Sequence, residues 1–308
     1  MRVSSCKHHN AAHTEAGGGP LGQQHTVGHS TRFYTTLHDH IHGRSAMHST
    51  DATRYTRRYF RSALTMTAAV GAVLSCSDFI PPDESGTFYG PVAALGAGTA
   101  RSYVTLDRSG NPTDLGVALT EAGLTGLPAA STEYVVALPR EASATVYKHA
   151  TINWQPAGHG PGSAYALPHF DMHVYMITEA ERQGIALGDA ELAAKMVRQP
   201  AAEFVPAGYV PGPARVGMGM HWTDPSAPEQ NGQPFTHTFF YGSYDGAFML
   251  MEPMVTKTLL ETKPAAVVTP LKLPAQYAAR GYQATSYTVA WDAGAKEYRV
   301  ALSGLVMR

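Results

Sequence analysis

The sequence predicts a mainly β protein, a single sandwich or barrel domain with a few short helices, preceded by an export signal. From residue 88 onward, short runs of β-branched and aromatic residues alternate with turns rich in glycine and proline. The chain of 308 residues is 44% hydrophobic and only 15% charged, which favours a compact body over long solvated helices or disorder. No internal repeat or linker follows residue 87, so we expect one domain over residues 88–308.

Residues 1–55 form a predicted disordered extension that is rich in histidine. Its first 50 residues hold nine of the fifteen histidines and show no apolar periodicity, so this stretch cannot build a core. Two interpretations are open. The extension is either a metal-scavenging tail or an overlong start, with Met47 as the first residue translated.

Residues 56–76 resemble a twin-arginine lipoprotein signal. Arg57 and Arg58 precede an apolar stretch of about thirteen residues, too short to span a bilayer as a stable helix. The stretch ends at Cys76, the expected lipidation site, and residues 77–87 follow as a tether. We therefore expect an exported protein of the cell envelope or periplasm that contacts the membrane only through a lipid anchor. Twin-arginine export carries folded proteins, which favours a bound metal.

Nine segments have the composition and alternation of strands. They cover residues 88–94, 99–106, 132–138, 144–154, 169–177, 235–241, 246–251, 284–292 and 296–303. Asp245-Gly246 is a hairpin signal between two of them. A second hairpin is predicted at residues 292–295, where Gly294 is expected to supply the positive φ.

Helical patterns are confined to three short segments. They cover residues 118–124, 178–183 and 189–198. The second segment begins with Thr178 and has Glu181 three residues later, the spacing of a capping box. Helices are therefore expected to be a minor part of the fold.

The most informative segment is the predicted strand at residues 169–177. At a period of two, His169, Asp171, His173 and Tyr175 share one face, while the opposite face is apolar. The Cα atoms of the two histidines would lie about 13 Å apart on a straight strand. Each histidine could therefore pair with the aspartate between them, but joint ligation of one ion would need a bulge or curvature.

Four side chains from separate segments make a candidate metal site. Three imidazoles and one carboxylate suit first-row divalent ions such as Zn²⁺, Mn²⁺ or Fe²⁺ and leave an open coordination position. The predicted ligands are His169, His173, His221 and Glu252, with Asp171 and Asp224 expected to orient the imidazoles. The simpler alternative is that the histidines only form hydrogen-bonded or surface pairs.

Further residues complete this hypothetical site. Tyr175 and Tyr241 are candidate proton donors, and Trp222 and His237 are candidate pocket walls. The function that follows is a metal-dependent envelope enzyme of unknown substrate. The alternative is a non-catalytic lipoprotein that binds a metal or small ligand, or whose polar clusters satisfy one another in a β core.

Four motifs carry a resemblance to a known family. They are H-F-D-x-H-x-Y from residue 169, M-G-x-H-W-x-D from 218, P-F-T-x-T-x-x-Y-G-x-Y-D-G from 234 and E-P-M from 252. In this order they resemble a little-characterised bacterial family of exported β-rich proteins, a domain of unknown function. The resemblance covers residues 88–308 and implies a shared β-rich fold with the four predicted ligands in one pocket. In ligand type the set is also similar to the three-His, one-Glu sites of cupins.

Composition limits the partners. The formal net charge of -1 argues against a nucleic-acid partner held by bulk charge. The two cysteines, Cys6 and Cys76, both precede the predicted domain, so we expect neither a disulfide framework nor a thiolate metal site within it. The expected partners are an unidentified small molecule and a second copy of the chain, because exposed strand edges favour homo-oligomers.

Overall fold

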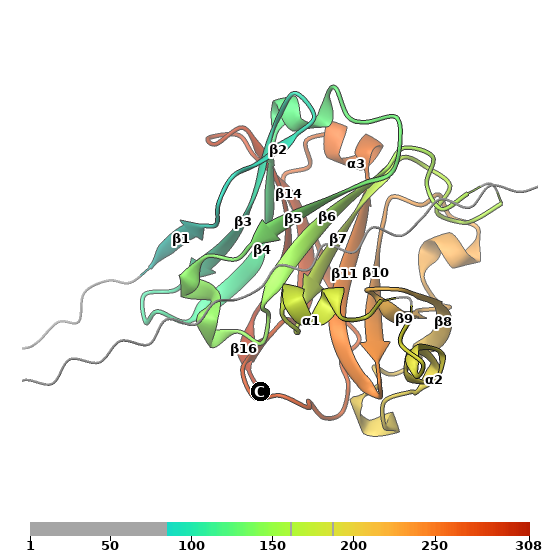
Figure 1. Cartoon of the computed structure of the whole chain (residues 1–308). Coiled ribbons are helices and arrows are strands. Elements are labelled where there is room, and N and C mark those ends of the chain that lie inside the picture. The colour runs from blue at the N-terminus through green and yellow to red at the C-terminus, as the bar shows by residue number, and fades with distance from the viewer. Residues whose placement is uncertain (1–84, 161, 187) are drawn as a thin grey trace, which may run out of the picture. The chain divides into compact units, whose positions relative to one another are not determined.

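Two antiparallel β-sheets pack face to face (Figure 1). The structure is a computed structural model that describes residues 85–308, apart from residues 161 and 187. Sheet I has the strand order β1-β3-β4-β15-β14-β12, with β2 also paired to β3. Its strands are β1 (Gly86–Tyr89), β2 (Ala93–Leu95), β3 (Gly98–Leu106), β4 (Pro112–Thr120), β12 (Val267–Pro270), β14 (Ser286–Asp292) and β15 (Glu297–Ser303).

Sheet II has the strand order β5-β6-β7-β11-β10-β9-β8. Its strands are β5 (Thr132–Ala137), β6 (His149–Gln155), β7 (His169–Tyr175), β8 (Val210–Arg215), β9 (Gly219–Thr223), β10 (His237–Tyr244) and β11 (Ala247–Thr256). Two short strands, β13 (Tyr282–Gln283) and β16 (Val306–Met307), form a separate pair. The mainly β prediction is confirmed, and of its two alternatives the structure is the sandwich.

The hydrophobic core lies between the two sheets. Leu115 and Val117 of sheet I, and Ile152 and Met172 of sheet II, belong to one buried cluster. Full burial of one such side chain stabilises the fold by about 1.5–3 kcal/mol. Successive residues of a strand point to opposite faces. The residues that alternate with these core positions on sheet II therefore point to its outer face.

Strand β4 corrects one helix prediction. Residues 118–120 end this strand, and only Glu121–Leu124 turn into a short 3₁₀ helix, η1. Leu115, Val117 and Leu119 follow the period of a strand, and all three are buried in the core. Strand pairing decided the conformation, because β4 lies between β3 and β15 and bonds to both.

The two predicted hairpins are both present, but only one turn has the predicted chemistry. Asp245 and Gly246 join β10 to β11 with φ of 52° and 84°, the paired positive values that a tight two-residue turn requires. In the turn between β14 and β15, Lys296 takes the left-handed conformation with φ of 54°. The expected role of Gly294 is therefore wrong.

Helices are few and short, as predicted. Helix α1 (Glu179–Gln183) has the expected capping box between Thr178 and Glu181, while α2 (Leu192–Val197) is shorter than its predicted segment. The segment carrying α1 and α2 is labelled in Figure 1. It supplies Ile185 and Leu192 to a buried cluster with strand residues of sheet II. The remaining helical elements are α3 (Lys257–Glu261), η2 (Arg140–Ala144), η3 (Ala202–Phe204) and η4 (Pro228–Asn231).

Most of the N-terminal predictions concern residues that the structure does not describe. The histidine-rich extension, the signal at 56–76 with Cys76, and most of the tether lie outside the described residues. Strand β1 begins at Gly86, within two residues of the predicted start of the domain. Within the described part of the chain, no helix is long and apolar enough to cross a membrane.

Candidate metal centre

A pocket of about 580 Å³ lies on the outer face of sheet II. Its walls come from β6, β7 and β8 to β11, together with the loop between β6 and β7. The lining residues are Gln155, His159, Ser163, Tyr165, Asp171, His173, Pro213, Arg215, Val216, Met218, His221, Thr223, Phe240 and Glu252. Five of these side chains are histidines or carboxylates, so the pocket is the polar centre of this face.

The strand pattern explains why the polar centre is flanked by apolar groups. Along β11, Leu250, Glu252 and Met254 alternate onto the outer face. Leu250 belongs to the buried cluster with α2, and Met254 belongs to a second cluster with Tyr165, Phe235 and Phe240. Glu252 lies between these clusters and is only 2% exposed. A carboxylate buried in this way requires a cationic or hydrogen-bonding partner.

Glu252 of β11 lies close to one histidine of β7 and one histidine of β9. In the pairing of β7 with β11, Met251 lies opposite Val174 and Met254 opposite Asp171, so Glu252 lies beside His173. His173 Nε2 is 3.3 Å from Glu252 Oε1. His221 Nε2, from β9, is 3.5 Å from Glu252 Oε2. One ligand atom from each residue lies within 4.8 Å of the other two, a spacing that could hold a metal ion.

The other ring nitrogen of each histidine is already committed. His173 Nδ1 lies 3.1 Å from Asn153 Oδ1, and His221 Nδ1 lies 3.1 Å from the carbonyl oxygen of Pro213. Both oxygens only accept hydrogen bonds, so each Nδ1 carries the proton and each Nε2 keeps its lone pair. Metal-binding histidines are held in this way by a partner behind the ring.

The orientation of Asn153 is itself fixed. Its Nδ2 donates to Glu133 Oε2 at 3.3 Å, which leaves Oδ1 to face the imidazole of His173. Thr151 Oγ1 donates to the same oxygen at 3.0 Å. Burial lowers the pKa of His173, but the neighbouring carboxylates, Glu252 foremost, together outweigh it and raise the pKa above its usual value. The surroundings of His173 therefore favour a positive charge at its Nε2.

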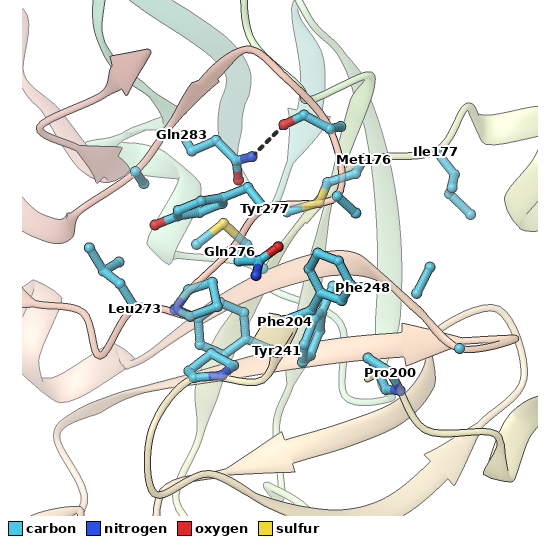
Figure 2. A pocket seen from close by; sticks show the side chains of 18 residues that line it. Met176, Ile177, Pro200, Phe204, Tyr241, Phe248, Leu273, Gln276, Tyr277 and Gln283 are labelled. Atoms are coloured by element: carbon cyan, nitrogen blue, oxygen red, sulfur yellow. Dashed lines mark hydrogen bonds between the residues drawn. The ribbon is translucent and has the colours of Figure 1, made fainter. Parts of the chain in front are cut away.

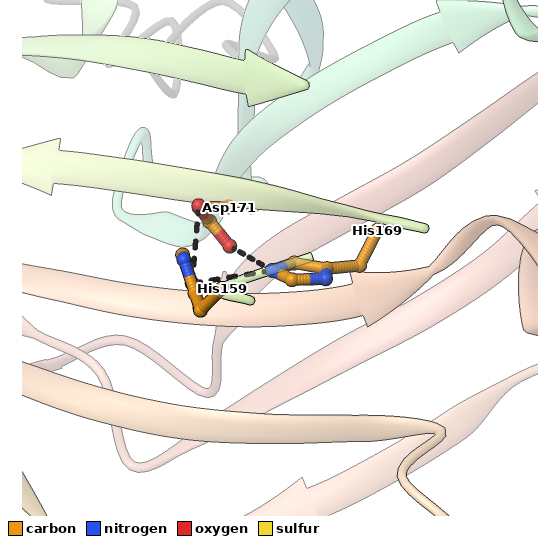
Figure 3. Close-up of side chains that lie close together, drawn as sticks. All are labelled: His159, His169 and Asp171. Atoms are coloured by element: carbon orange, nitrogen blue, oxygen red, sulfur yellow. Dashed lines mark hydrogen bonds and ion pairs between the residues drawn. The ribbon is translucent and has the colours of Figure 1, made fainter. Parts of the chain in front are cut away.

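A second group of three side chains borders the first: His159, His169 and Asp171 (Figure 3). His169 Nε2 lies 3.0 Å from Asp171 Oδ1 and 3.3 Å from His159 Nε2. His159 Nε2 lies 3.7 Å from Asp171 Oδ2. Burial works to raise the pKa of Asp171, but the neighbouring histidines, His169 foremost, lower it below its usual value. Asp171 is therefore an ionised carboxylate in a buried position.

The structure separates the predicted ligands into these two groups. His173, His221 and Glu252 lie together, whereas His169 lies with Asp171 and His159. The separation follows from the strand geometry, because residues four apart on β7 cannot reach one ion without a bulge. Asp171, expected to orient the imidazoles of the predicted ligands, contacts His169.

His159 was not predicted. It lies in the loop between β6 and β7, flanked by Gly158 and Gly160, which both have positive φ. A histidine between two glycines in a turn gives no periodic signal. Only its position next to the strand that carries His169 could have pointed to it.

Three further predicted residues lie away from the pocket. Asp224 forms an ion pair with Lys272 at 2.6 Å. Trp222 is part of the core between the sheets, where its Nε1 donates to Ser243 Oγ at 2.8 Å. His237 Nε2 lies 3.2 Å from Thr269 Oγ1. Trp222 alternates with His221 on β9, so the residue that follows a pocket-facing side chain necessarily faces the core.

The two predicted proton donors are also placed elsewhere. Tyr241 lines a separate, mainly apolar pocket next to Phe204, Phe248 and Tyr277 (Figure 2), and its hydroxyl donates to the carbonyl of Lys272 at 2.9 Å. Tyr175 shares the face of His173 as predicted, but its ring stacks on His149 with centroids 4.4 Å apart. Burial raises the pKa of both phenols, so neither gives up its proton readily.

Comparison with known proteins adds a family match over a short part of the chain. Residues 107–154 match the TTHB210-like family, described as "Hypothetical protein TTHB210". No curated protein and no solved structure matches the chain. The matched segment contains Thr151 and Asn153 but none of the six side chains of the two groups. The match fits the expectation of an uncharacterised family and gives no support to a likeness to cupins.

Proposed function

We propose that this protein binds a divalent metal ion through His173, His221 and Glu252 and uses it on a small molecule that enters the pocket. The observation that carries the proposal is the fixed orientation of the two histidines. Their Nδ1 atoms are held by Asn153 and Pro213, so both Nε2 lone pairs are free beside one buried carboxylate. Two imidazoles and one carboxylate suit Zn²⁺, Mn²⁺ or Fe²⁺.

A three-ligand site leaves room for chemistry. A divalent ion in such a site polarises a bound oxygen or lowers the pKa of a water molecule. Phe240 and Met218 line the same pocket and would exclude bulk water from one side. His221 is the most accessible of the three side chains, at 12% exposed, so the open side of the site lies toward β9. These features support a metal-dependent enzyme of unknown substrate.

The competing explanation is a set of side chains that satisfy one another without a metal. In that case, a protonated His173 would form an ion pair with Glu252 at their 3.3 Å separation. The two explanations differ in what a neutral, isosteric replacement of Glu252 does. Loss of a ligand removes the metal, whereas loss of an ion pair only lowers the free energy of unfolding.

Metal content of the purified full-length chain tests the proposal. The variants are Glu252→Gln and Glu297→Gln, a matched control because Glu297 is a buried carboxylate of sheet I. After stripping and reloading with Zn²⁺, elemental mass spectrometry should find one equivalent fewer in Glu252→Gln than in the wild type and the control. The histidine-rich N-terminal region contributes equally to all three. Equal metal content in three folded proteins would contradict the proposal.

On the sequence alone, we also propose that the protein is exported and lipid-anchored at Cys76. The support is the twin-arginine-like segment followed by an apolar stretch that ends in this cysteine. Cells that express the full chain should incorporate labelled palmitate into the wild type but not into Cys76→Ser, and only the wild type should sediment with membranes. Equal labelling of both would overturn this part of the proposal.

A further inference from the structure

We infer that the neighbouring group of His159, His169 and Asp171 binds a second divalent cation, so that the pocket is a two-metal site. The inference deepens the proposed function and rests on it for the first ion. The second ion is argued independently, from the geometry of its own three side chains. None of the sequence motifs contains His159, which completes the group.

The spacing of the three ligand atoms suits a small tetrahedral ion. With metal–nitrogen distances of about 2.0–2.1 Å, two ligands of a tetrahedral ion lie about 3.3 Å apart. His169 Nε2 lies 3.0 Å from Asp171 Oδ1 and 3.3 Å from His159 Nε2, and one ligand atom from each of the three residues lies within 4.8 Å of the others. The first two distances are close to the required value, so little movement is needed to bind an ion.

The orientation of His169 leaves its ligand atom free. Its Nδ1 lies 2.6 Å from the carbonyl oxygen of Leu167, which only accepts, so Nδ1 carries the proton. In the neutral ring, Nε2 therefore keeps a lone pair, 3.0 Å from Asp171 Oδ1 and 3.3 Å from His159 Nε2. A carboxylate oxygen and an imidazole lone pair this close repel each other unless a proton or a metal ion lies within the group.

The Asp171 carboxylate is held in place through one oxygen, Oδ2, while its other oxygen, Oδ1, lies beside His169. Its Oδ2 accepts from Gln155 Nε2 at 3.1 Å, which fixes the carboxylate. Its Oδ1 is buried and accepts no hydrogen bond from any residue that the structure describes. The 3.0 Å contact with His169 lacks hydrogen-bond geometry. A proton on His169 bridges at most two of the three ligand atoms, whereas a metal ion contacts all three.

The position of the group makes a shared centre reasonable. His169, Asp171 and His173 alternate on one face of β7, so the two groups are neighbours along the strand. His159 and Asp171 line the same pocket as His173, His221 and Glu252. The His159 side chain is 38% exposed and gives an ion access from the loop side. Pairs of metal ions in enzymes clamp the oxygen atoms of one substrate between them.

Stoichiometry and magnetic coupling test the inference on the full-length chain. The variants are His159→Ala, Asp171→Asn, Glu252→Gln and the matched control His237→Ala, a histidine outside the pocket. The probe is Mn²⁺ added to stripped protein, with bound equivalents measured by elemental analysis and coupling by electron paramagnetic resonance. We expect His159→Ala and Asp171→Asn to lose one equivalent relative to the wild type and the control. The coupled Mn²⁺ signal should disappear in these variants and in Glu252→Gln.

The outcomes separate this inference from the proposed function. If His159→Ala and Asp171→Asn keep the wild-type stoichiometry while Glu252→Gln loses one equivalent, the second site is wrong and the first stands. If only the first two variants lose an equivalent, the proposed function fails and the second site stands. If no variant loses metal, both are overturned.

Discussion

At the scale of single residues, Asn153 shows how a side chain outside the ligand set controls the site. It accepts from His173 Nδ1 and Thr151 and donates to Glu133, so it holds one imidazole in one orientation. An asparagine in a β-strand is unfavourable by propensity alone. Its position on β6, directly opposite Asp171 on β7, instead suits the polar face that both strands share.

Replacing Asn153 should weaken metal binding without removing a ligand. In Asn153→Leu, the imidazole of His173 loses its acceptor and can rotate, and loss of such a supporting partner typically lowers metal affinity by about 10–100-fold. Competition with a chromophoric chelator measures the change. Asn111→Leu is the control, because Asn111 bonds Tyr282 away from the pocket. An affinity equal to that of the control would show that Asn153 does not position His173.

At the scale of elements, the first residue of β9 helps to determine where His221 lies. Gly219 begins this strand with φ of +71°, and a Cβ at this position would lie 2.1 Å from the carbonyl oxygen of Ser243 on β10. Glycine is therefore required at this position for two reasons, its backbone conformation and the close approach of the two strands. His221 follows two residues later, so the fit between β9 and β10 fixes where its imidazole lies.

Gly219→Ala should destabilise the protein and also weaken metal binding. The positive φ alone costs about 1 kcal/mol for a residue with a side chain, and the clash with Ser243 adds to it. Gly232→Ala is a matched control, with φ of +82° and no atom within 4 Å of the added Cβ. Urea unfolding should therefore show a larger loss for Gly219→Ala than for Gly232→Ala. A loss of metal affinity is expected only in Gly219→Ala.

At the scale of the whole molecule, the candidate ligands join strands that are distant in sequence. Those of the first group come from β7, β9 and β11, and the loop between β6 and β7 adds His159. An ion bound by them would connect these strands across the outer face of sheet II, and it would be lost on unfolding. Metal binding should therefore be coupled to the stability of the whole domain.

Metal should raise the melting temperature of the wild type. A free Zn²⁺ concentration of about 100 times Kd stabilises the folded state by about 2.7 kcal/mol. For a domain of this size, that corresponds to an increase in Tm of roughly 5–11 °C. Differential scanning calorimetry with and without a chelator measures it, and Glu252→Gln should show a smaller increase than the wild type. The same increase in Glu252→Gln would assign the stabilising ion to another site.

The sequence by itself determined the mainly β class, most strands of sheet II and the face on which His169, Asp171 and His173 lie, because side-chain alternation is a local property of a strand. The same alternation places Trp222 on the face opposite His221. Local pattern alone did not reveal that Tyr241 lines a different pocket. Only the tertiary structure decided that His221 and Glu252 join His173, while His169 joins His159 and Asp171. Those groupings depend on the pairing register of strands distant in sequence and on how a loop folds over the sheet, and both are non-local.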